Sequence, residues 1–283
     1  MQSVLLKNGE TMPKLGMGTW YMGEDPFKAK NEIESLRLGF ELGIPLIDTA
    51  EMYGEGLSEE LVGQAIAPLD RKKLVLVSKV YPFNAGRRNI FRSCEDSLRR
   101  LGAEYLDLYL LHWRGSVPLK ETVECMEELK ASGKIRMWGV SNFDTRDMKE
   151  LWNVPGGENC VVNQVLYHLG SRGIEFDLLP WMKEHQVAAM GYCPLAQKGS
   201  LRRGMYQDKN LQTVAARHNA TPAQILLAFA LLQDHLIPIP KAGTPEHVRL
   251  NAAAQEIHLT AEDLTILEHS FPAPKRKIYL DIV

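Results

Sequence analysis

Three short apolar runs in this sequence each end on a side chain that can donate, accept or attract a proton. These side chains are Asp48, Lys79 and His112, and Tyr53 follows the first of them by five positions. If the runs are parallel strands of one barrel, their C-terminal ends converge at one mouth, where barrel enzymes carry their catalytic side chains. One reaction would then need all four residues together.

Reduction of a carbonyl group is the reaction that this combination favours. Hydride transfer to the carbonyl carbon leaves negative charge on the oxygen, so a proton donor and fixed dipoles must lie beside that oxygen. Tyr53 can donate the proton if the ammonium of Lys79 lowers the pKa of the phenol from its ordinary value of about 10. Asp48 would hold Lys79 in place, and His112 would hydrogen-bond the carbonyl oxygen and orient the substrate.

The same residues are also compatible with less specific roles and with different chemistry. Taken singly, an aspartate can cap a loop, a tyrosine can pack in the core, and a lysine can belong to a structural ion pair. A barrel lyase or isomerase could use Lys79 as a Schiff-base amine, although Asp48 nearby would keep that amine charged. A cofactor-binding regulatory or redox-sensing barrel without significant turnover is a further alternative, because a fold does not guarantee activity.

Eight apolar runs alternate with helix-length amphipathic stretches, which is typical of a parallel sheet with helical crossovers. The runs cover residues 15–19, 44–48, 74–79, 106–112, 135–141, 161–164, 187–193 and 236–241. Eight strands in 283 residues predict an α/β fold, one (β/α)8 TIM barrel that spans residues 1–283 as a single domain. An open doubly wound sheet is the structural alternative, but no Pro-, Gly- or Ser-rich linker divides the chain.

Turn and capping signals mark further elements. Residues 4–12 contain two apolar stretches around an Asn-Gly pair and predict an N-terminal β-hairpin that plugs the bottom of the barrel. Thr221 and Pro222 predict the start of a helix over residues 223–232. Residues 191–204 form the longest turn-like stretch and are predicted to be an active-site loop.

The composition argues against several classes of partner and ligand. A formal net charge of -2, without a long basic run, gives no electrostatic footprint for nucleic acid or anionic lipid. We expect no membrane span and no export signal, because the sequence lacks a long apolar stretch and a basic leader. The cysteines have no paired spacing, so we expect a reduced, cytoplasmic protein without a bound metal. They are Cys94, Cys125, Cys160 and Cys193.

Seven segments of the sequence resemble those of the aldo-keto reductases, in the same order and over nearly the whole chain. They are Gly18-Thr19-Trp20, residues 46–50 with Tyr53, Val77-Ser78-Lys79, residues 106–113, residues 139–143, Asn163-Gln164 and Ile239-Pro240-Lys241. The resemblance implies that the four candidate residues form the catalytic tetrad of this family, with Tyr53 as the general acid.

Three segments narrow the resemblance to a bacterial branch that reduces methylglyoxal and similar small aldehydes. These segments cover residues 18–24, 163–173 and 177–181. The branch implies a small carbonyl compound as the substrate. The family default is a monomer, and we expect the same here.

The same resemblance implies a nicotinamide cofactor, NADPH with NADH as an alternative, extended across the barrel mouth. The residues that it implies for cofactor binding are Gly18, Thr19, Trp20, Ser141, Asn142, Gln164, Tyr192, Cys193, Pro194, Leu195, Lys241, Thr244, His247 and Asn251. Independently of the family, Lys241 just before a Gly-Thr-Pro helix start is a plausible anion site.

Departures from the family pattern bear on the cofactor. His247 stands where many members have an arginine that grips the 2′-phosphate, Ala242 stands where a serine is common, and Cys193 replaces another common serine. Arg249 could compensate for the lost charge. The expected preference for NADPH therefore rests on Lys241 and the family tendency.

Aromatic side chains just beyond the predicted strand ends indicate an apolar substrate cleft. They are Trp20, Tyr21, Tyr81, Trp113 and Tyr167, of which Trp20, Tyr81 and Trp113 are the predicted substrate contacts. A short loop after Trp113 and a brief C-terminal tail predict a shallow pocket. Such a pocket favours small aldehydes, α-oxoaldehydes and some ketones.

Overall fold

Eight parallel strands form one curved sheet in the computed structural model of the chain, which describes residues 2–197 and 199–283. Their order in the sheet follows their order in the sequence. They are β3 (Gly16–Gly18), β4 (Leu46–Asp48), β5 (Val75–Val80), β6 (Leu106–Leu111), β7 (Ile135–Ser141), β8 (Val162–Leu166), β9 (Ala188–Tyr192) and β10 (Leu236–Pro238). Each strand overlaps one of the eight predicted runs.

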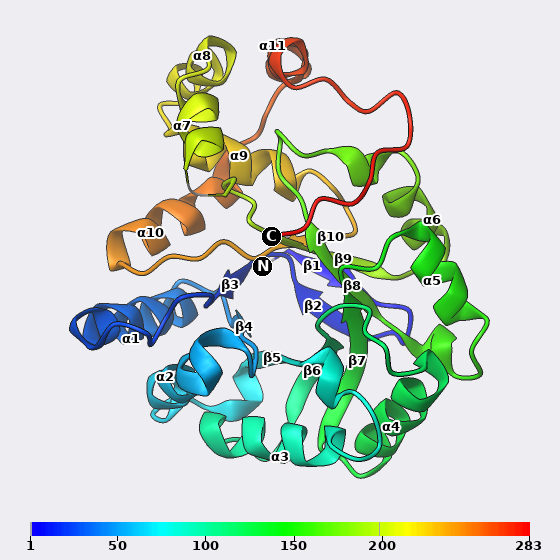
Figure 1. The fold of residues 1–283 in the computed structure, drawn as a ribbon. Coiled ribbons are helices and arrows are strands. Elements are labelled where there is room, and N and C mark those ends of the chain that lie inside the picture. Colours follow the sequence, from blue (N-terminus) through cyan, green and yellow to red (C-terminus); the bar gives the residue numbers. More distant parts are fainter. Residues whose placement is uncertain (1, 198) are drawn as a thin grey trace.

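Helices surround these strands in Figure 1 and cover the outer face of the sheet. They are α1 (Pro26–Glu41), α2 (Leu57–Ile66), α3 (Ile90–Leu101), α4 (Leu119–Ala131), α5 (Thr145–Trp152), α6 (Leu178–Glu184), α7 (Ser200–Tyr206), α8 (Lys209–Arg217), α9 (Pro222–Leu231), α10 (Pro245–Ala253) and α11 (Ala261–Ser270). None of the helices in this described part of the chain has the length and apolar content needed to cross a bilayer.

The sheet closes between its first and last strands. A parallel bridge joins Gly18 to Lys241, and the backbone N–H of Gly18 donates to the carbonyl oxygen of Pro240 over 3.2 Å. A Cβ atom on Gly18 would lie only 2.8 Å from the carbonyl oxygen of Ile239, so a glycine permits this close approach. The predicted TIM barrel is confirmed.

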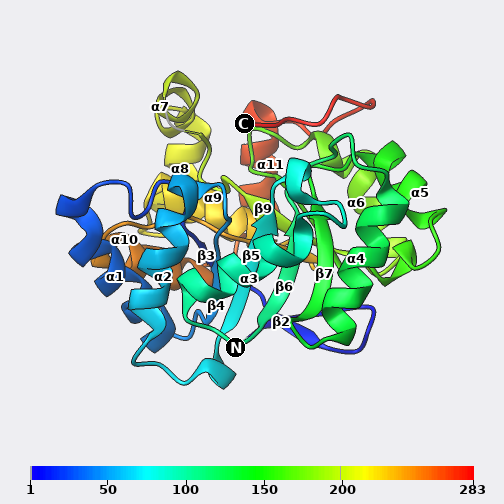
Figure 2. The same cartoon turned by 60° about the horizontal axis from the view of Figure 1, so that its bottom comes forward.

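The N-terminal hairpin covers the bottom of the barrel, as predicted. β1 (Ser3–Leu5) pairs with antiparallel β2 (Thr11–Pro13). Val4 and Met12 pack in one buried cluster with strand residues such as Leu46 and Val77, and the apolar contact seals this end of the barrel. Figure 2 shows the hairpin and the C-terminus at opposite ends of the strands. The mouth therefore lies at the end that the C-terminal tail reaches.

Local capping signals agree with the observed element boundaries, with one correction. Thr221 and Gln224 form a capping box at the start of α9, where the sequence predicts a helix. The predicted active-site loop over residues 191–204 is shorter than expected. β9 continues to Tyr192 because it pairs with both β8 and β10, and α7 already begins at Ser200.

Candidate active site

Adjacent strands place the four candidate residues side by side at the mouth. Asp48 ends β4, Lys79 is the penultimate residue of β5, and Tyr53 begins a short 3-10 turn that follows β4. His112 comes directly after β6, where its backbone N–H donates to the carbonyl oxygen of Val80 over 3.1 Å. The parallel register thus converts three separate strand ends into one cluster.

The ammonium of Lys79 is the centre of this cluster. Its Nζ donates to Oδ2 of Asp48 and to the carbonyl oxygen of Thr49, both over 2.8 Å, and to the Tyr53 hydroxyl over 3.1 Å. The other carboxylate oxygen of Asp48 accepts from Nε2 of Gln164 over 2.7 Å. Burial lowers the pKa of Lys79 and raises the pKa of Asp48, and the attraction between the two charges opposes both shifts.

The Tyr53 side chain is held by a tight turn and by aromatic neighbours. Gly54 and Gly56 in this turn have φ of 56° and 97°, in the region that glycine adopts readily. The phenol ring lies edge-on to the His112 ring at a centroid distance of 5.7 Å and stacks against Trp20 at 6.3 Å. These contacts leave the hydroxyl directed to Nζ of Lys79.

The expected lowering of the pKa of Tyr53 is wrong. Burial raises the pKa of this phenol well above its ordinary value, and the negative charge of Asp48 adds to the shift. The phenol therefore keeps its proton at neutral pH and is available as a proton donor.

The His112 imidazole is buried in its neutral form. Burial, together with the charge of Lys79, lowers the pKa of His112 to about 2. Its Nδ1 is buried without a hydrogen-bond partner in residues 2–197 and 199–283. Because a buried N–H without an acceptor is rarely tolerated, we infer that the proton is on Nε2. A neutral ring with this tautomer can donate one hydrogen bond from Nε2.

Amide and hydroxyl side chains from β7, β8 and β9 form a second group at the mouth. The Ser141 hydroxyl donates to the carbonyl oxygen of Gln164 over 2.9 Å, and the Tyr192 hydroxyl donates to Oδ1 of Asn142 over 2.8 Å. Asn142 has a left-handed φ of 60°, and its Nδ2 donates to the carbonyl oxygen of His112 over 3.2 Å. A strained backbone fixed by such contacts is typical of a functional site.

Both groups border one cavity of about 710 Å³. The predicted residues that line it are Gly18, Thr19, Trp20, Tyr21, Asp48, Tyr53, His112, Trp113, Ser141, Asn142, Gln164, Tyr192, Cys193, Pro194, Leu195 and Lys241. Lys79 lies behind this wall and is fully buried, so a carbonyl carbon in the cavity cannot reach its amine. The arrangement argues against the Schiff-base hypothesis.

Lys241 lines the cavity and lies four residues before the start of α10. Its Nζ is 3.9 Å from Oε1 of Glu32, a buried carboxylate on α1 whose other oxygen accepts from the Gly23 N–H over 2.9 Å. Thr244 caps α10 by accepting from the backbone N–H of His247 over 3.4 Å. An ammonium beside a helix N-terminus attracts phosphate, and Glu32 moderates that attraction.

Some predicted contacts lie outside the cavity. Thr244, His247 and Asn251 belong to the cap and body of α10 and do not line it. Tyr81 also does not line it and instead packs edge-on against Trp113 at 5.2 Å.

The prediction that Tyr167 lines the cleft is wrong. Its ring is fully buried and stacks on Phe229, and its hydroxyl donates to Glu175 over 2.7 Å. Tyr167 is a core residue.

The structure adds lining residues that were not predicted, which are Met52, Arg114, Ile282 and Val283. Ala196, Gln197 and Arg202 also line the cavity, and they fall within the predicted active-site loop over residues 191–204. Arg202 on α7 donates from Nε and Nη2 to the carbonyl oxygen of Ala196, which itself has a left-handed φ of 64°. Although the C-terminal tail is brief, its last two residues, Ile282 and Val283, line the cavity.

Within the part of the chain that the structure describes, no His, Cys, Asp and Glu side chains are grouped to hold a metal ion. The chemistry of the cavity is that of a phenol, an imidazole, amides and two kinds of cation.

Comparison with known proteins identifies the family. A model of the aldo/keto reductase family matches residues 14–270. Methylglyoxal reductase YeaE of Escherichia coli (strain K12) is 54% identical over 273 residues, which are 96% of each chain. The chain therefore belongs to the aldo/keto reductase family, and it is an NAD(P)H-dependent oxidoreductase.

Solved structures give the same result. An aldo/keto reductase from Klebsiella pneumoniae, in complex with NADP and acetate, superimposes with a TM-score of 0.96 at 53% identity over 99% of both chains. A Klebsiella pneumoniae aldo-keto reductase in complex with NADPH has a TM-score of 0.96 and 52% identity, and the match covers 100% of this chain and 99% of that chain.

Proposed function

We propose that this enzyme uses NADPH to reduce small aldehydes to alcohols, with methylglyoxal and other α-oxoaldehydes and some ketones as substrates. The observation that carries the proposal is the contact of Lys79 Nζ with Tyr53 at 3.1 Å and with Asp48 at 2.8 Å, beside the cavity. The similarity to a methylglyoxal reductase supports the substrate class. The similarity to structures with bound NADP or NADPH supports the cofactor.

The side chains of the cavity fit a nicotinamide dinucleotide. Ser141, Asn142 and Gln164 offer hydroxyl and amide groups that match a carboxamide, and Tyr192 offers an aromatic face beside them. Lys241, which also lines the cavity, offers an ammonium for a phosphate group. When bound, NADPH would supply the hydride for the carbonyl carbon.

Tyr53 supplies the proton in this mechanism. Its O–H bond breaks as the carbonyl oxygen takes the proton, and the phenolate that remains is stabilised by the hydrogen bond from Lys79. Burial lowers the pKa of Lys79, which makes its ammonium a stronger donor to that phenolate. Asp48 holds the ammonium in position.

His112 orients the substrate. A neutral imidazole donates a hydrogen bond from Nε2 to the carbonyl oxygen without competing with Tyr53 as an acid. Trp20 and Trp113 supply apolar walls for the rest of a small aldehyde.

A substrate screen tests the proposed function. Methylglyoxal, a panel of further aldehydes, ketones and sugars are incubated with NADPH or NADH, and the loss of nicotinamide absorbance is followed. We expect turnover of small aldehydes that is faster with NADPH than with NADH. Demonstrated cofactor binding without turnover of any compound would contradict the proposal and support the regulatory or redox-sensing alternative.

The domain organisation, oligomeric state and location belong to the same proposal. We propose a single domain over residues 1–283, a monomer and a cytoplasmic location, without nucleic acid or membrane partners. Sedimentation of the purified protein measures its oligomeric state directly.

A further inference from the structure

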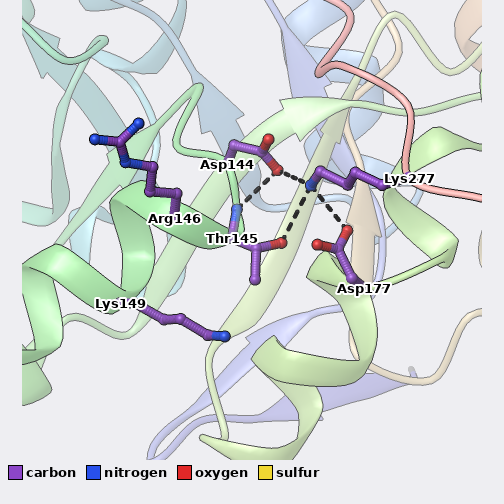
Figure 3. A pocket seen from close by; sticks show the side chains of 6 residues that line it. All are labelled: Asp144, Thr145, Arg146, Lys149, Asp177 and Lys277. Carbon is purple, nitrogen blue, oxygen red and sulfur yellow. Dashed lines mark hydrogen bonds and ion pairs between the residues drawn. The ribbon is translucent and has the colours of Figure 1, made fainter.

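A second pocket lies outside the candidate active site and surrounds Lys277 (Figure 3). The Lys277 ammonium bonds to Oδ1 of Asp144, to Oδ1 of Asp177 over 2.9 Å and to the Thr145 hydroxyl over 3.4 Å. Burial opposes the charge, but the hydrogen bonds to the two carboxylates raise the pKa of Lys277. We call Lys277, Asp144 and Asp177 the ionic clasp.

The clasp joins the C-terminal tail, residues 271–283, to two helices of the barrel wall. Asp144 caps α5 and Asp177 precedes α6. Beyond Lys277 the tail runs from the region of α6 toward the centre of the barrel, where it ends (Figure 1). Asp281 accepts a hydrogen bond from the Ser171 hydroxyl, and the next two residues line the catalytic cavity.

Apolar packing alone holds this tail only weakly. Tyr279, Ile282 and Val283 are 93%, 58% and 55% exposed, and Leu280 is only partly buried. Side chains with so much exposed surface contribute little burial energy. Polar contacts therefore hold much of the tail: Lys277 and Asp281 make side-chain bonds, and the backbone of Val283 bonds with Tyr192.

We propose that the ionic clasp positions Ile282 and Val283 as a wall of the substrate site and thereby limits the size of the aldehyde that the enzyme accepts. This inference rests on the proposed function. Lys277 is a positioning residue, because it lies outside the catalytic cavity and acts through the tail. Because the nicotinamide occupies part of the cavity, the space left for the aldehyde is limited by the walls. Displacement of the wall formed by Ile282 and Val283 would enlarge this space and admit larger aldehydes.

Asp177→Asn is the sharpest test of the clasp. The Asp177 side chain makes no capping bond to α6, whereas Asp144 accepts from the Thr145 backbone N–H and caps α5. The substitution therefore removes one charge of the clasp without uncapping a helix. Lys277→Arg keeps the positive charge and should retain wild-type behaviour. Lys275→Ala is the matched control, because it also removes a positive charge from the tail, but Lys275 is exposed and interacts with Glu268 rather than with the clasp.

Two measurements read the position of the tail. The first is the ratio of kcat/KM for phenylglyoxal to that for methylglyoxal, two α-oxoaldehydes that differ in size. We expect Asp177→Asn to raise this ratio about threefold to tenfold, mainly through the KM for phenylglyoxal. The second is the rate of tryptic cleavage after Arg276, which should rise by a similar factor while the melting temperature stays near that of the wild type.

The outcomes separate this inference from the proposed function. If the wild type reduces both aldehydes and Asp177→Asn leaves the ratio and the cleavage rate unchanged, the clasp does not position the wall. A rise of equal size in Lys275→Ala would contradict the inference as well. If the wild type reduces neither aldehyde, the proposed function fails and the size limit fails with it, while faster cleavage in Asp177→Asn would still show that the clasp holds the tail.

Discussion

Replacement of His112 with phenylalanine tests whether the imidazole is buried in its neutral form. The pKa of His112 is lowered from its ordinary value of 6.5 to about 2. An unfolded chain therefore binds a proton near pH 6.5 that the folded chain does not bind. The contribution of the neutral ring to stability is fully present above about pH 6.5 and is lost as the pH falls toward the folded value.

The size of this loss follows from the pKa values. From the ordinary value of 6.5 down to pH 5 there are about 1.5 pH units, and each corresponds to about 1.4 kcal/mol. The wild type should therefore lose about 2 kcal/mol of its free energy of unfolding between pH 7.5 and pH 5 beyond the loss in His112→Phe. The figure holds for any folded pKa below about 4, because such a ring stays neutral over this whole range.

Urea unfolding at the two pH values measures this difference. The titration of the other groups cancels when the pH dependence of the free energy of unfolding in His112→Phe is subtracted from that in the wild type. His258→Phe is a control for the same kind of substitution outside the active site, because that side chain is exposed. Equal pH dependence in the wild type and His112→Phe would refute the argument that His112 is buried as a neutral ring.

Three further substitutions test other contacts. Lys79→Met should lower the rate constant of single-turnover reduction by about 10²- to 10⁴-fold, while the Kd of the cofactor changes little. A wild-type rate constant would remove Lys79 from the mechanism. Glu32→Gln removes a negative charge 3.9 Å from Lys241, so the attraction of Lys241 for a phosphate group should increase. The ratio of kcat/KM with NADPH to kcat/KM with NADH should therefore rise about threefold to tenfold. An unchanged ratio would show that Glu32 does not tune the cofactor site. Gly18→Ala should lower the free energy of unfolding by about 2–4 kcal/mol, because the Cβ of the alanine would lie 2.8 Å from the Ile239 carbonyl oxygen. Wild-type stability in urea would contradict this account of barrel closure.

The strands and the cluster at their ends are predictable from the sequence because both depend on local patterns. Apolar runs that end at Asp48, Lys79 and His112 mark buried strands, and parallel pairing then brings their ends to one edge. The helix starts at Thr221 and Thr244 follow from capping chemistry for the same reason.

Contacts between distant segments were not predictable in this way. The tail residues Ile282 and Val283 wall the cavity, but nothing in their spacing indicates where an irregular segment lies. Glu32 meets Lys241 across the barrel closure and is surrounded in sequence by ordinary helix residues. The raised pKa of Tyr53 depends on the depth of its burial, which a sequence pattern does not give.

The central claim is that the Tyr53 phenol, paired with Lys79, delivers the proton in aldehyde reduction. Single-turnover reduction of methylglyoxal by Tyr53→Phe with bound NADPH tests it most directly. Tyr105→Phe is the control, because Tyr105 directly precedes β6 and so lies at the opposite end of the barrel from the mouth. We predict a loss of about 10²- to 10⁴-fold in the rate of Tyr53→Phe, with the Kd for NADPH within about twofold of the wild type. A wild-type rate in Tyr53→Phe would contradict the claim.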